Sequence, residues 1–367
     1  MTVSHPTSST VGGAADVRSL LGDARDLVLP ALRAAVDGLH PDLARLCGYH
    51  FGWCDENGTP AGHGDGKYLR AALVSLSAQA AGAGTESAVP GAVAVELVHN
   101  FSLLHDDIMD SDDRRRGRSA AWAVFGVPAS ILAGDALIAL ALGQLTPLAG
   151  EVGRDVTRLL VGALDEMICG QAADLALDTL GVADVTTEHY VAATGKTTAL
   201  LSCCTAIGAR LGGAPVTLAD QLREATRHLG LSWQLANDVE DIWGDPVITG
   251  KPAFSDLRGG KKTFPVIAAL RSGTPAGRSL ATALDDARAT VATAVGESAL
   301  SAWASAIEAA GGRARAERLS RDHLDRAVGL LTEALPESPA RERLIGLFRL
   351  IVTRDAPPRP AATGAQG

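Results

Sequence analysis

The chain has 367 residues, with 33 lysines and arginines against 42 aspartates and glutamates, which gives a formal net charge of −9. This balance argues against a general nucleic-acid-binding protein, because such a protein needs a basic face. Hydrophobic residues make up 47% of the chain and aromatic residues only 4%. The core must therefore consist mainly of alanine, leucine and valine, a composition that favours helices over an all-β structure.

Both ends of the chain are predicted to be disordered. Residues 1–15 are rich in serine, threonine, glycine and alanine, and residues 356–367 hold several prolines and glycines. No linker, internal repeat or block of like charge divides residues 16–355, so we expect one domain there. Within it, Gly52–Gly66 is predicted to be a loop because glycine, aspartate, asparagine and proline accumulate in it.

After this loop the sequence predicts one helix after another. The expected segments are Lys67–Ala83, Gly91–Asp110, Pro128–Leu145, Arg154–Asp178, Glu188–Leu211, Leu218–Trp243 and Phe264–Leu270, with three or four more up to Thr353. Gly212-Gly213 is a stop signal, and no segment alternates apolar and polar residues over the length of a strand. Ala193–Leu211 is apolar almost all round, as in a central helix. We therefore predict an all-α fold, a single large helical bundle.

Cysteine spacing and the absence of targeting signals bear on location. The five cysteines are Cys47, Cys54, Cys169, Cys203 and Cys204. None forms a CxxC pair, which is typical of free thiols in a reducing compartment. No N-terminal segment has a basic start followed by an apolar stretch, so we expect no secretory signal, and the uncharged stretch Ala136–Gly150 is too short for a membrane span. We expect a cytoplasmic protein without stable membrane insertion.

The most informative segment is Asp106-Asp107-Ile108-Met109-Asp110, at the end of an apolar helix. Asp106 and Asp110 are four residues apart and share one helix face. Carboxylates at the end of a buried helix are costly unless a cation neutralises them. Mg²⁺ suits two such carboxylates, because it takes oxygen ligands and leaves positions for substrate phosphates. The arginines Arg114-Arg115-Arg116 follow, and arginine binds phosphate oxygens bidentately.

A second cluster, Asn237-Asp238-Val239-Glu240-Asp241, also closes an apolar helix. Asn237, Asp241 and Asp245 again share a face, and lysines follow the cluster. Acidic residues followed by basic ones thus occur twice, each time at the end of a predicted core helix. The pair of clusters predicts a site for Mg²⁺ and diphosphate.

In these motifs the chain resembles the trans-isoprenyl diphosphate synthases of the polyprenyl synthetase family, which includes farnesyl and geranylgeranyl diphosphate synthases. The resemblance runs from about Asp42 to Thr353. The first cluster matches the family's DDxxD motif, and the second lies where the second aspartate-rich motif belongs. The resemblance implies an all-α bundle with a central cavity for the prenyl chain. It also implies a homodimer.

The resemblance further implies how two substrates are bound. Three Mg²⁺ ions hold an allylic diphosphate between the two motifs in the substrate complex, with Asp106, Asp110, Asp241 and Asn237 as metal ligands. The residues assigned to the allylic diphosphate and its ionisation are Arg115, Lys196, Thr197, Gln234, Lys251, Lys261, Gln171 and Asp174. Those assigned to isopentenyl diphosphate are Lys67 and Arg70 of a GKxxR signature, His99 and Arg116. Lys196 and Thr197 resemble a pair at a helix break.

The implied reaction is ionisation of the allylic diphosphate, condensation with isopentenyl diphosphate and loss of a proton. Phe101 and Ser102, five and four residues before Asp106, match positions at which a bulky side chain limits the product length in this family. Phe101 could close the tunnel, whereas Ser102 leaves space. Since the first motif also carries no insertion, the pattern resembles enzymes that make a C20 product.

Two other interpretations stay open at the level of sequence. Class I terpene cyclases bind Mg²⁺ with an asparagine-led triad, and Asn237 with Asp241 and Asp245 has that spacing but the wrong second and third residues. The isopentenyl diphosphate set argues against a cyclase, which does not need this substrate. A catalytically weakened regulatory subunit of a prenyl synthase is the third interpretation, and the intact first motif argues against it.

Overall fold

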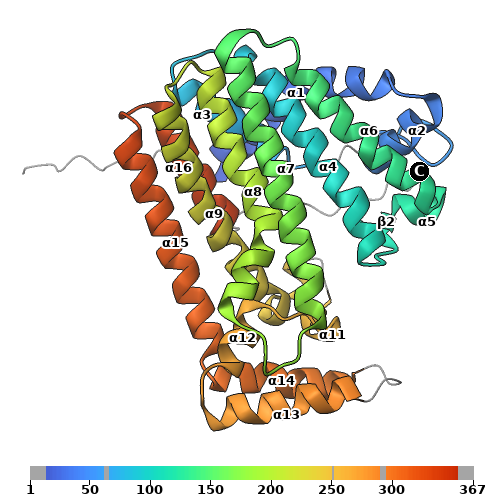
Figure 1. The fold of residues 1–367 in the computed structure, drawn as a ribbon, viewed down its shortest axis with the longest axis vertical. Coiled ribbons are helices and arrows are strands. Elements are labelled where there is room, and N and C mark those ends of the chain that lie inside the picture. Colours follow the sequence, from blue (N-terminus) through green and yellow to red (C-terminus); the bar gives the residue numbers. More distant parts are fainter. Residues whose placement is uncertain (1–13, 62–65, 250–251, 290–294, 354–367) are drawn as a thin grey trace, which may run out of the picture. The chain divides into compact units, whose positions relative to one another are not determined.

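The computed structural model describes residues 14–61, 66–249, 252–289 and 295–353, and almost all regular structure in them is helical (Figure 1). The longer helices are α1 (Ala14–Asp37), α2 (Pro41–His50), α3 (Leu69–Ala80), α4 (Val89–Met109), α6 (Val127–Leu145), α7 (Gly150–Thr179), α8 (Thr187–Leu211), α9 (Val216–Trp243), α13 (Pro275–Ala289), α14 (Glu297–Ala309), α15 (Gly312–Ala334) and α16 (Pro339–Thr353). The shorter ones are η1 (Thr85–Ala88), α5 (Ala121–Phe125), α10 (Pro246–Thr249), α11 (Ser255–Arg258) and α12 (Phe264–Leu270). The predicted all-α fold is confirmed.

The chain forms two compact units, each assembled from separate segments. The first comprises residues 1–162, 203–223 and 332–347, and the second comprises residues 163–202, 224–331 and 348–367. Helices α7, α8 and α9 contribute residues to both. Both predicted tails lie outside the described residues except for Ala14 and Ala15, which begin α1, and residues 354 and 355 are likewise not described.

Helix α4 is the central element of the first unit. It packs against α1, α3 and α6, and its residues from Gly91 to Val98 are all buried. Its last residues emerge, since Met109 and Asp110 are exposed. The sequence therefore brings the first acidic motif to the surface at the end of a core helix.

One local feature was not predicted. Two-residue strands β1 (Arg114–Arg115) and β2 (Arg118–Ser119) form a small antiparallel hairpin. Arg116 and Gly117 at its turn have φ values of 51° and 80°, and positive φ at both central residues is the geometry that suits the twist of a hairpin. A hairpin this short gives no period-two pattern in the sequence.

In the second unit, two apolar clusters surround α12. One joins Leu177 of α7, Tyr190 of α8 and Leu235 of α9 with Phe264 and Ile267 of α12. The other joins α12 to α13 and α14 through residues such as Leu280, Leu300 and Trp303. Pro265 at the first turn favours the start of α12, since its missing N–H is not needed there. The helix has the bounds that the sequence predicted.

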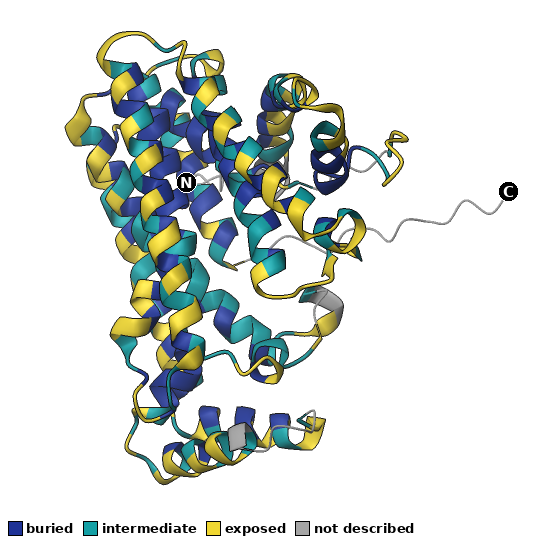
Figure 2. Ribbon diagram, turned by 45° about the vertical axis from the view of Figure 1, so that its right-hand side comes forward, coloured by how far each residue is buried: buried dark blue, intermediate teal, exposed yellow. Residues whose placement is uncertain are grey.

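Helix α8 fits the prediction of a central helix, because residues 198–210 are buried without interruption (Figure 2). Gly213, with φ of 85°, follows its last turn in the left-handed region that glycine favours. Within the described residues, Thr85–Met109 and Val127–Leu145 are long and apolar enough to cross a membrane by length and composition alone. The most apolar window of the first is 67% buried inside the protein, as in a core helix, and that of the second only 28%.

Candidate active site

The three aspartates of the first motif do not all lie on one face at the end of α4. Each residue of a helix is turned by about 100° from the one before it, so Asp106 and Asp110 share a face that Asp107 does not. Asp107 has a side chain only 1% exposed, and Nε of Arg115 donates to its two carboxylate oxygens over 2.7 and 2.8 Å. Asp106 is half-buried and Asp110 is exposed. The first motif thus offers two carboxylates on one face.

The hairpin β1–β2 carries the arginines and is fastened to α2. Arg118 donates from Nη2 to the carbonyl oxygen of Tyr49 over 2.8 Å, and its guanidinium lies 4.7 Å above the Tyr49 ring. The Tyr49 hydroxyl in turn donates to the carbonyl oxygen of Ser119 over 2.8 Å. These contacts fix the turn in which Arg116 stands.

The residues predicted to hold isopentenyl diphosphate are brought together in the first unit. Burial, followed by the charges of Arg70, Arg116 and Arg115, holds the pKa of His99 well below its usual range. His99 is therefore a neutral hydrogen-bonding group among arginines. Lys67, also assigned to this substrate, is exposed two residues before the start of α3.

Glu96 is the buried counter-charge of this arginine cluster, and the sequence did not single it out. Its Oε1 accepts a hydrogen bond from the backbone N of Ala71 over 3.1 Å. Because the N-cap residue Tyr68 is left-handed and makes no side-chain cap bond, Glu96 supplies an acceptor to the first turn of α3. Burial raises the pKa of Glu96, and Arg70 opposes this. Glu96 thereby anchors the helix turn that carries Arg70.

His50 is a second member of this cluster that the sequence did not reveal. It is 6% exposed, and its buried Nε2 has no hydrogen-bond partner among the described residues. Burial, with the charges of Arg116 and Arg115, lowers the pKa of His50 to about 3. Like His99, it remains neutral at physiological pH.

The second acidic motif lies in the last turns of α9, in the second unit. Asp238 is 2% exposed. Its Oδ1 accepts from Nε2 of Gln234 over 3.0 Å, and its Oδ2 accepts from the backbone N of Phe264 over 3.0 Å. Burial raises the pKa of Asp238 to about 6, against the opposing effect of these hydrogen bonds. Asn237 and Asp241 are half-buried, so Asp238 has the inward position that Asp107 has in the first motif.

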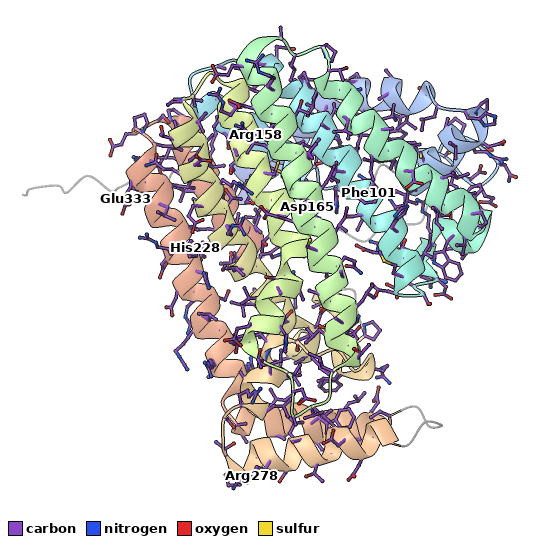
Figure 3. All side chains as sticks on the ribbon, viewed as in Figure 1. Phe101, Arg158, Asp165, His228, Arg278 and Glu333 are labelled. Atoms are coloured by element: carbon purple, nitrogen blue, oxygen red, sulfur yellow. The ribbon has the colours of Figure 1, made fainter. Side chains whose placement is uncertain are left out.

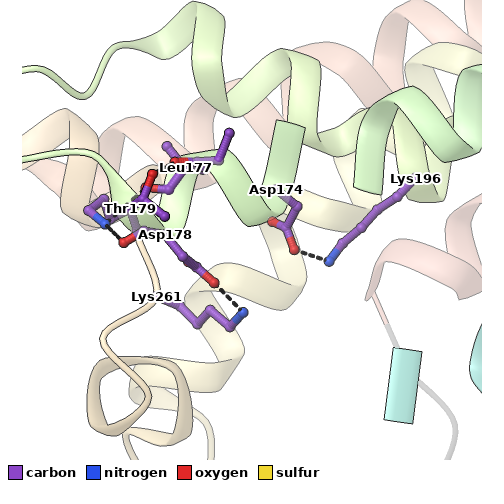
Figure 4. Close-up of polar contacts among 8 residues, drawn as sticks. Asp174, Leu177, Asp178, Thr179, Lys196 and Lys261 are labelled. Atoms are coloured by element: carbon purple, nitrogen blue, oxygen red, sulfur yellow. Dashed lines mark hydrogen bonds and ion pairs between the residues drawn. The ribbon is translucent and has the colours of Figure 1, made fainter. Parts of the chain in front are cut away.

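Helix α7 faces two of the predicted diphosphate-binding lysines. Nζ of Lys196 forms an ion pair with Asp174, and Nζ of Lys261 lies 2.8 Å from Oδ2 of Asp178 (Figure 4). Lys251, assigned to the same substrate, lies outside the described residues. The structure thus joins Asp174 and Lys196, both predicted site residues, and adds Asp178.

Helix α8 corrects one expectation. The resemblance placed Lys196 and Thr197 at a helix break, but α8 runs through both without interruption. Instead, the backbone of α8 lies unusually close to the backbone of α7 at this point. A Cβ at Gly170 would lie 2.1 Å from the backbone N of Lys196 and 2.6 Å from the carbonyl carbon of Gly195. Only glycine permits this contact, and it brings the backbone at Lys196 against α7.

Three further predicted residues have defined surroundings. Gln171 is half-buried on α7, and both its amide atoms are buried without a hydrogen-bond partner among the described residues. The Phe101 ring packs edge-on against His105, with centroids 5.0 Å apart, and Figure 3 shows it on α4. Ser102 donates from its hydroxyl to the carbonyl oxygen of His99 over 2.9 Å.

Comparison with known proteins agrees with this arrangement. Residues 53–300 match the sequence model of the Polyprenyl synthetase family. A (2E,6E)-farnesyl diphosphate synthase of Mycobacterium tuberculosis is 42% identical over 339 residues, which cover 92% of this chain and 93% of the relative. A geranylgeranyl diphosphate synthase of the same organism is 41% identical over 341 residues, covering 92% and 94%. The crystal structure of a polyprenyl synthetase from Streptomyces coelicolor A3(2) superposes with a TM-score of 0.85 at 44% identity, covering 92% of this chain and all of the other.

The family match covers more than half of the chain, and the relatives match it over almost their whole length. Together with the two acidic motifs and their basic partners, this shows that the chain belongs to the polyprenyl synthetase family and is a prenyl-transferring trans-isoprenyl diphosphate synthase.

Proposed function

We propose that this synthase condenses isopentenyl diphosphate with an allylic diphosphate to form a C20 product, geranylgeranyl diphosphate, in a reaction that requires Mg²⁺. The observation that carries this proposal is the presence of two separate sets of cations. Arg70 and Arg116 lie near His99 in the first unit, and Lys196 and Lys261 pair with Asp174 and Asp178 of α7 in the second unit. Two diphosphate substrates require two such sets.

The residues present fit Mg²⁺. In the first motif, Arg115 engages Asp107, while Asp106 and Asp110 share a face of α4 that Asp107 does not. In the second, Asn237 and Asp241 share a face that the buried Asp238 does not. These oxygen donors are of the kind that Mg²⁺ accepts alongside substrate phosphates. When bound, the metal would supply Lewis-acid stabilisation of the departing diphosphate.

The side chains of the chain then have distinct tasks. The ammonium groups of Lys196 and Lys261 place fixed positive charge where negative charge develops as the allylic C–O bond breaks. Arg70, Arg116 and the neutral His99 hold isopentenyl diphosphate so that its double bond attacks the allylic cation. The new C–C bond forms, and the proton lost from isopentenyl diphosphate passes to the released diphosphate. Apolar helices exclude the water that would quench the cation.

Product length is proposed from the two residues before the first motif. Ser102 precedes Asp106 by four residues and shares its helix face, so a small side chain stands one turn below the motif. Phe101 is rotated by about 100° from Ser102 and packs against His105. This arrangement supports elongation beyond C15.

The protein is further proposed to be a cytoplasmic homodimer. Large apolar side chains on α6 are exposed in the isolated chain, with Leu132 at 58% and Ile131 at 41%. Exposed apolar faces of this kind mark sites of protein association. A second copy covering α6 would bury them, and size-exclusion chromatography with light scattering tests the dimer.

The proposed reaction is tested with purified protein, Mg²⁺ and labelled isopentenyl diphosphate, offered with C5, C10 or C15 allylic diphosphates. Label in a C20 diphosphate is the expected result. Label only in a C15 product would refute the chain length but not the condensation. A cyclic hydrocarbon formed from allylic substrate alone would identify a cyclase. No turnover until another subunit is added would identify a regulatory subunit.

A further inference from the structure

Asp178 is an acidic residue for which the reaction described above has no task. It lies on α7 four residues after Asp174, so the two carboxylates share one helix face. Each carboxylate is paired with a different lysine, Asp174 with Lys196 and Asp178 with Lys261 (Figure 4). Both lysines belong to the cations proposed to bind the allylic diphosphate.

The neighbouring lysine strengthens the attachment at this point. Nζ of Lys262 donates to the carbonyl oxygens of Leu177 and Asp178, over 2.9 Å in each case. These carbonyls belong to the last turn of α7, where carbonyl oxygens lack the usual intrahelical donor four residues on. That of Leu177 also accepts from the backbone N of Leu180 over 3.3 Å. Two consecutive lysines therefore bind the same helix end, one through the Asp178 side chain and the other through the backbone.

The segment that carries Lys261 and Lys262 is also bonded to α9. Two residues further on, the backbone N of Phe264 donates to the Asp238 carboxylate of the second motif. Residues 261–264 thus connect the end of α7 to α9 over a stretch of four residues. Within it, the Lys261 side chain is long and flexible, and its ion pair with Asp178 restricts where its ammonium group lies.

We infer that Asp178 is a positioning residue that holds the Lys261 ammonium group where the allylic diphosphate of the proposed reaction is bound. The side chains of Lys261 and Asp178 are 34% and 36% exposed, and ion pairs at such exposure contribute little to folding stability. The contact therefore acts mainly by restricting the position of the Lys261 ammonium group before the substrate binds. A charge that is already in place stabilises the departing diphosphate without a cost of reorganisation during the reaction. The inference rests on the proposed function, because it assumes that Lys261 meets a diphosphate.

Two effects of Asp178 have opposite signs. Its charge repels a diphosphate, but salt screens exposed charges beyond about 8 Å at physiological ionic strength. Its ion pair with Lys261, by contrast, acts over only 2.8 Å and is much less screened. We therefore expect the loss of positioning to outweigh the relief of repulsion when the carboxylate is removed.

The test is a kinetic cycle with Asp178→Asn, Asp178→Glu, Lys261→Gln and the double variant Asp178→Asn/Lys261→Gln. We expect Asp178→Asn to lower kcat/KM for the allylic diphosphate about tenfold, with an unchanged KM for isopentenyl diphosphate. Asp178→Glu keeps the carboxylate and should restore most of the loss. The double variant should be no slower than Lys261→Gln alone, because Asp178 acts through Lys261.

Asp165→Asn is the matched control, since Asp165 is exposed on the same helix (Figure 3) and its replacement changes the charge equally. It should behave like the wild type. The inference is overturned if Asp178→Asn matches or exceeds wild-type activity, if the double variant loses the product of the single effects, or if Asp178→Asn raises both KM values together with a fall in Tm.

A separate measurement distinguishes failure of this inference from failure of the proposed function. Calorimetry with Mg²⁺ and inorganic pyrophosphate reports binding without turnover. If the wild type makes no prenyl diphosphate, the proposed function fails, yet weaker pyrophosphate binding by Asp178→Asn would still support the positioning role. Equal binding by the two proteins would contradict it.

Discussion

Arg115 holds the carboxylate of Asp107 through its Nε, at 2.7 and 2.8 Å from the two oxygens. Asp238, at the same place in the second motif, is likewise buried and bonded to Gln234 and the backbone of Phe264. In both motifs the second residue is thus buried, whereas the first and last polar residues of the motif, Asp106 and Asp110 or Asn237 and Asp241, are half-buried or exposed. An aspartate-rich motif of this kind combines an anchor with a pair of ligands.

The anchor and a ligand should respond differently to substitution. Replacing Asp107 with Ala leaves Arg115 without its buried partner and should lower the free energy of unfolding by about 2 to 4 kcal/mol. Asp106→Asn should change it by less than about 0.5 kcal/mol while abolishing turnover. Urea unfolding of both variants, alongside activity, checks this. Equal destabilisation by the two substitutions would contradict the division of roles.

The second motif begins with Asn237, which contributes an amide oxygen but no charge. Asn237→Asp adds a carboxylate to the face that Asp241 shares, so Mg²⁺ should bind more tightly. We expect the Mg²⁺ concentration that gives half-maximal rate to fall several-fold. Initial rates over a Mg²⁺ series measure this for wild type and variant. An unchanged Mg²⁺ dependence would rule the explanation out.

The buried Glu96 opposes the charge of Arg70 within the arginine cluster. Glu96→Gln keeps a hydrogen-bond acceptor for Ala71 but removes the charge, and should destabilise the ligand-free protein by about 2 to 4 kcal/mol. Isopentenyl diphosphate restores negative charge and should recover part of that loss, so it should raise the Tm of Glu96→Gln by more than that of wild type. Thermal unfolding with and without the substrate measures both shifts, and equal shifts would refute the expectation.

The low pKa of His50 in the folded protein predicts that the free energy of unfolding depends on pH. Its pKa in the folded protein is about 3, compared with an ordinary value of 6.5. Between these values only the unfolded chain takes up the proton, so stability that is fully present above pH 6.5 is lost as the pH falls. The loss from this group should be about 2 kcal/mol at pH 5.

Urea unfolding at pH 7.5 and pH 5.0 tests this expectation, with His50→Asn as the variant that cannot titrate at this position. The wild type should lose about 2 kcal/mol more than the variant on acidification. A parallel loss in both proteins would mean that other groups cause the acid sensitivity.

Product length should respond to Ser102. Replacing it with Phe places a large ring one turn below Asp106 and should shift the main product from C20 to C15. Phe101→Ala should change product length less, because its ring packs against His105 instead of following the face of Asp106. Chromatography of the dephosphorylated products reads out both variants. A larger effect at Phe101 than at Ser102 would reverse this assignment.

Much of the fold followed from the sequence because helical periodicity is local. The apolar run before Asp106 had to be a buried helix, and the spacing of Asp106 and Asp110 put both on one face. Lys196 and Asp174 were singled out as candidate site residues by the resemblance. Their ion pair spans two helices, and only the folded chain shows it.

The remaining features depend on tertiary contacts, which the spacing of residues along the sequence does not reveal. Glu96 looked like one polar residue in an apolar helix, and its bond to Ala71 joins helices 25 residues apart in the chain. Asp178 was predicted only as the last residue of a helix, and its ion pair with Lys261 joins residues 83 positions apart in the chain. The expected helix break at Lys196 was wrong, since α8 continues through this residue. Because Gly170 has no side chain, the backbones of α7 and α8 approach each other closely at Gly195 and Lys196.

Arg116 occupies a left-handed position, with φ of 51°, next to a left-handed Gly117. Asparagine or glycine would adopt this conformation at lower cost than arginine. A sequence optimised for folding alone would therefore not keep arginine there, and stabilising changes at this turn would remove a cation that we propose binds isopentenyl diphosphate. Residue 116 is thus a site at which selection for thermal robustness and selection for catalysis favour different amino acids, and stability engineering of this enzyme should leave it untouched.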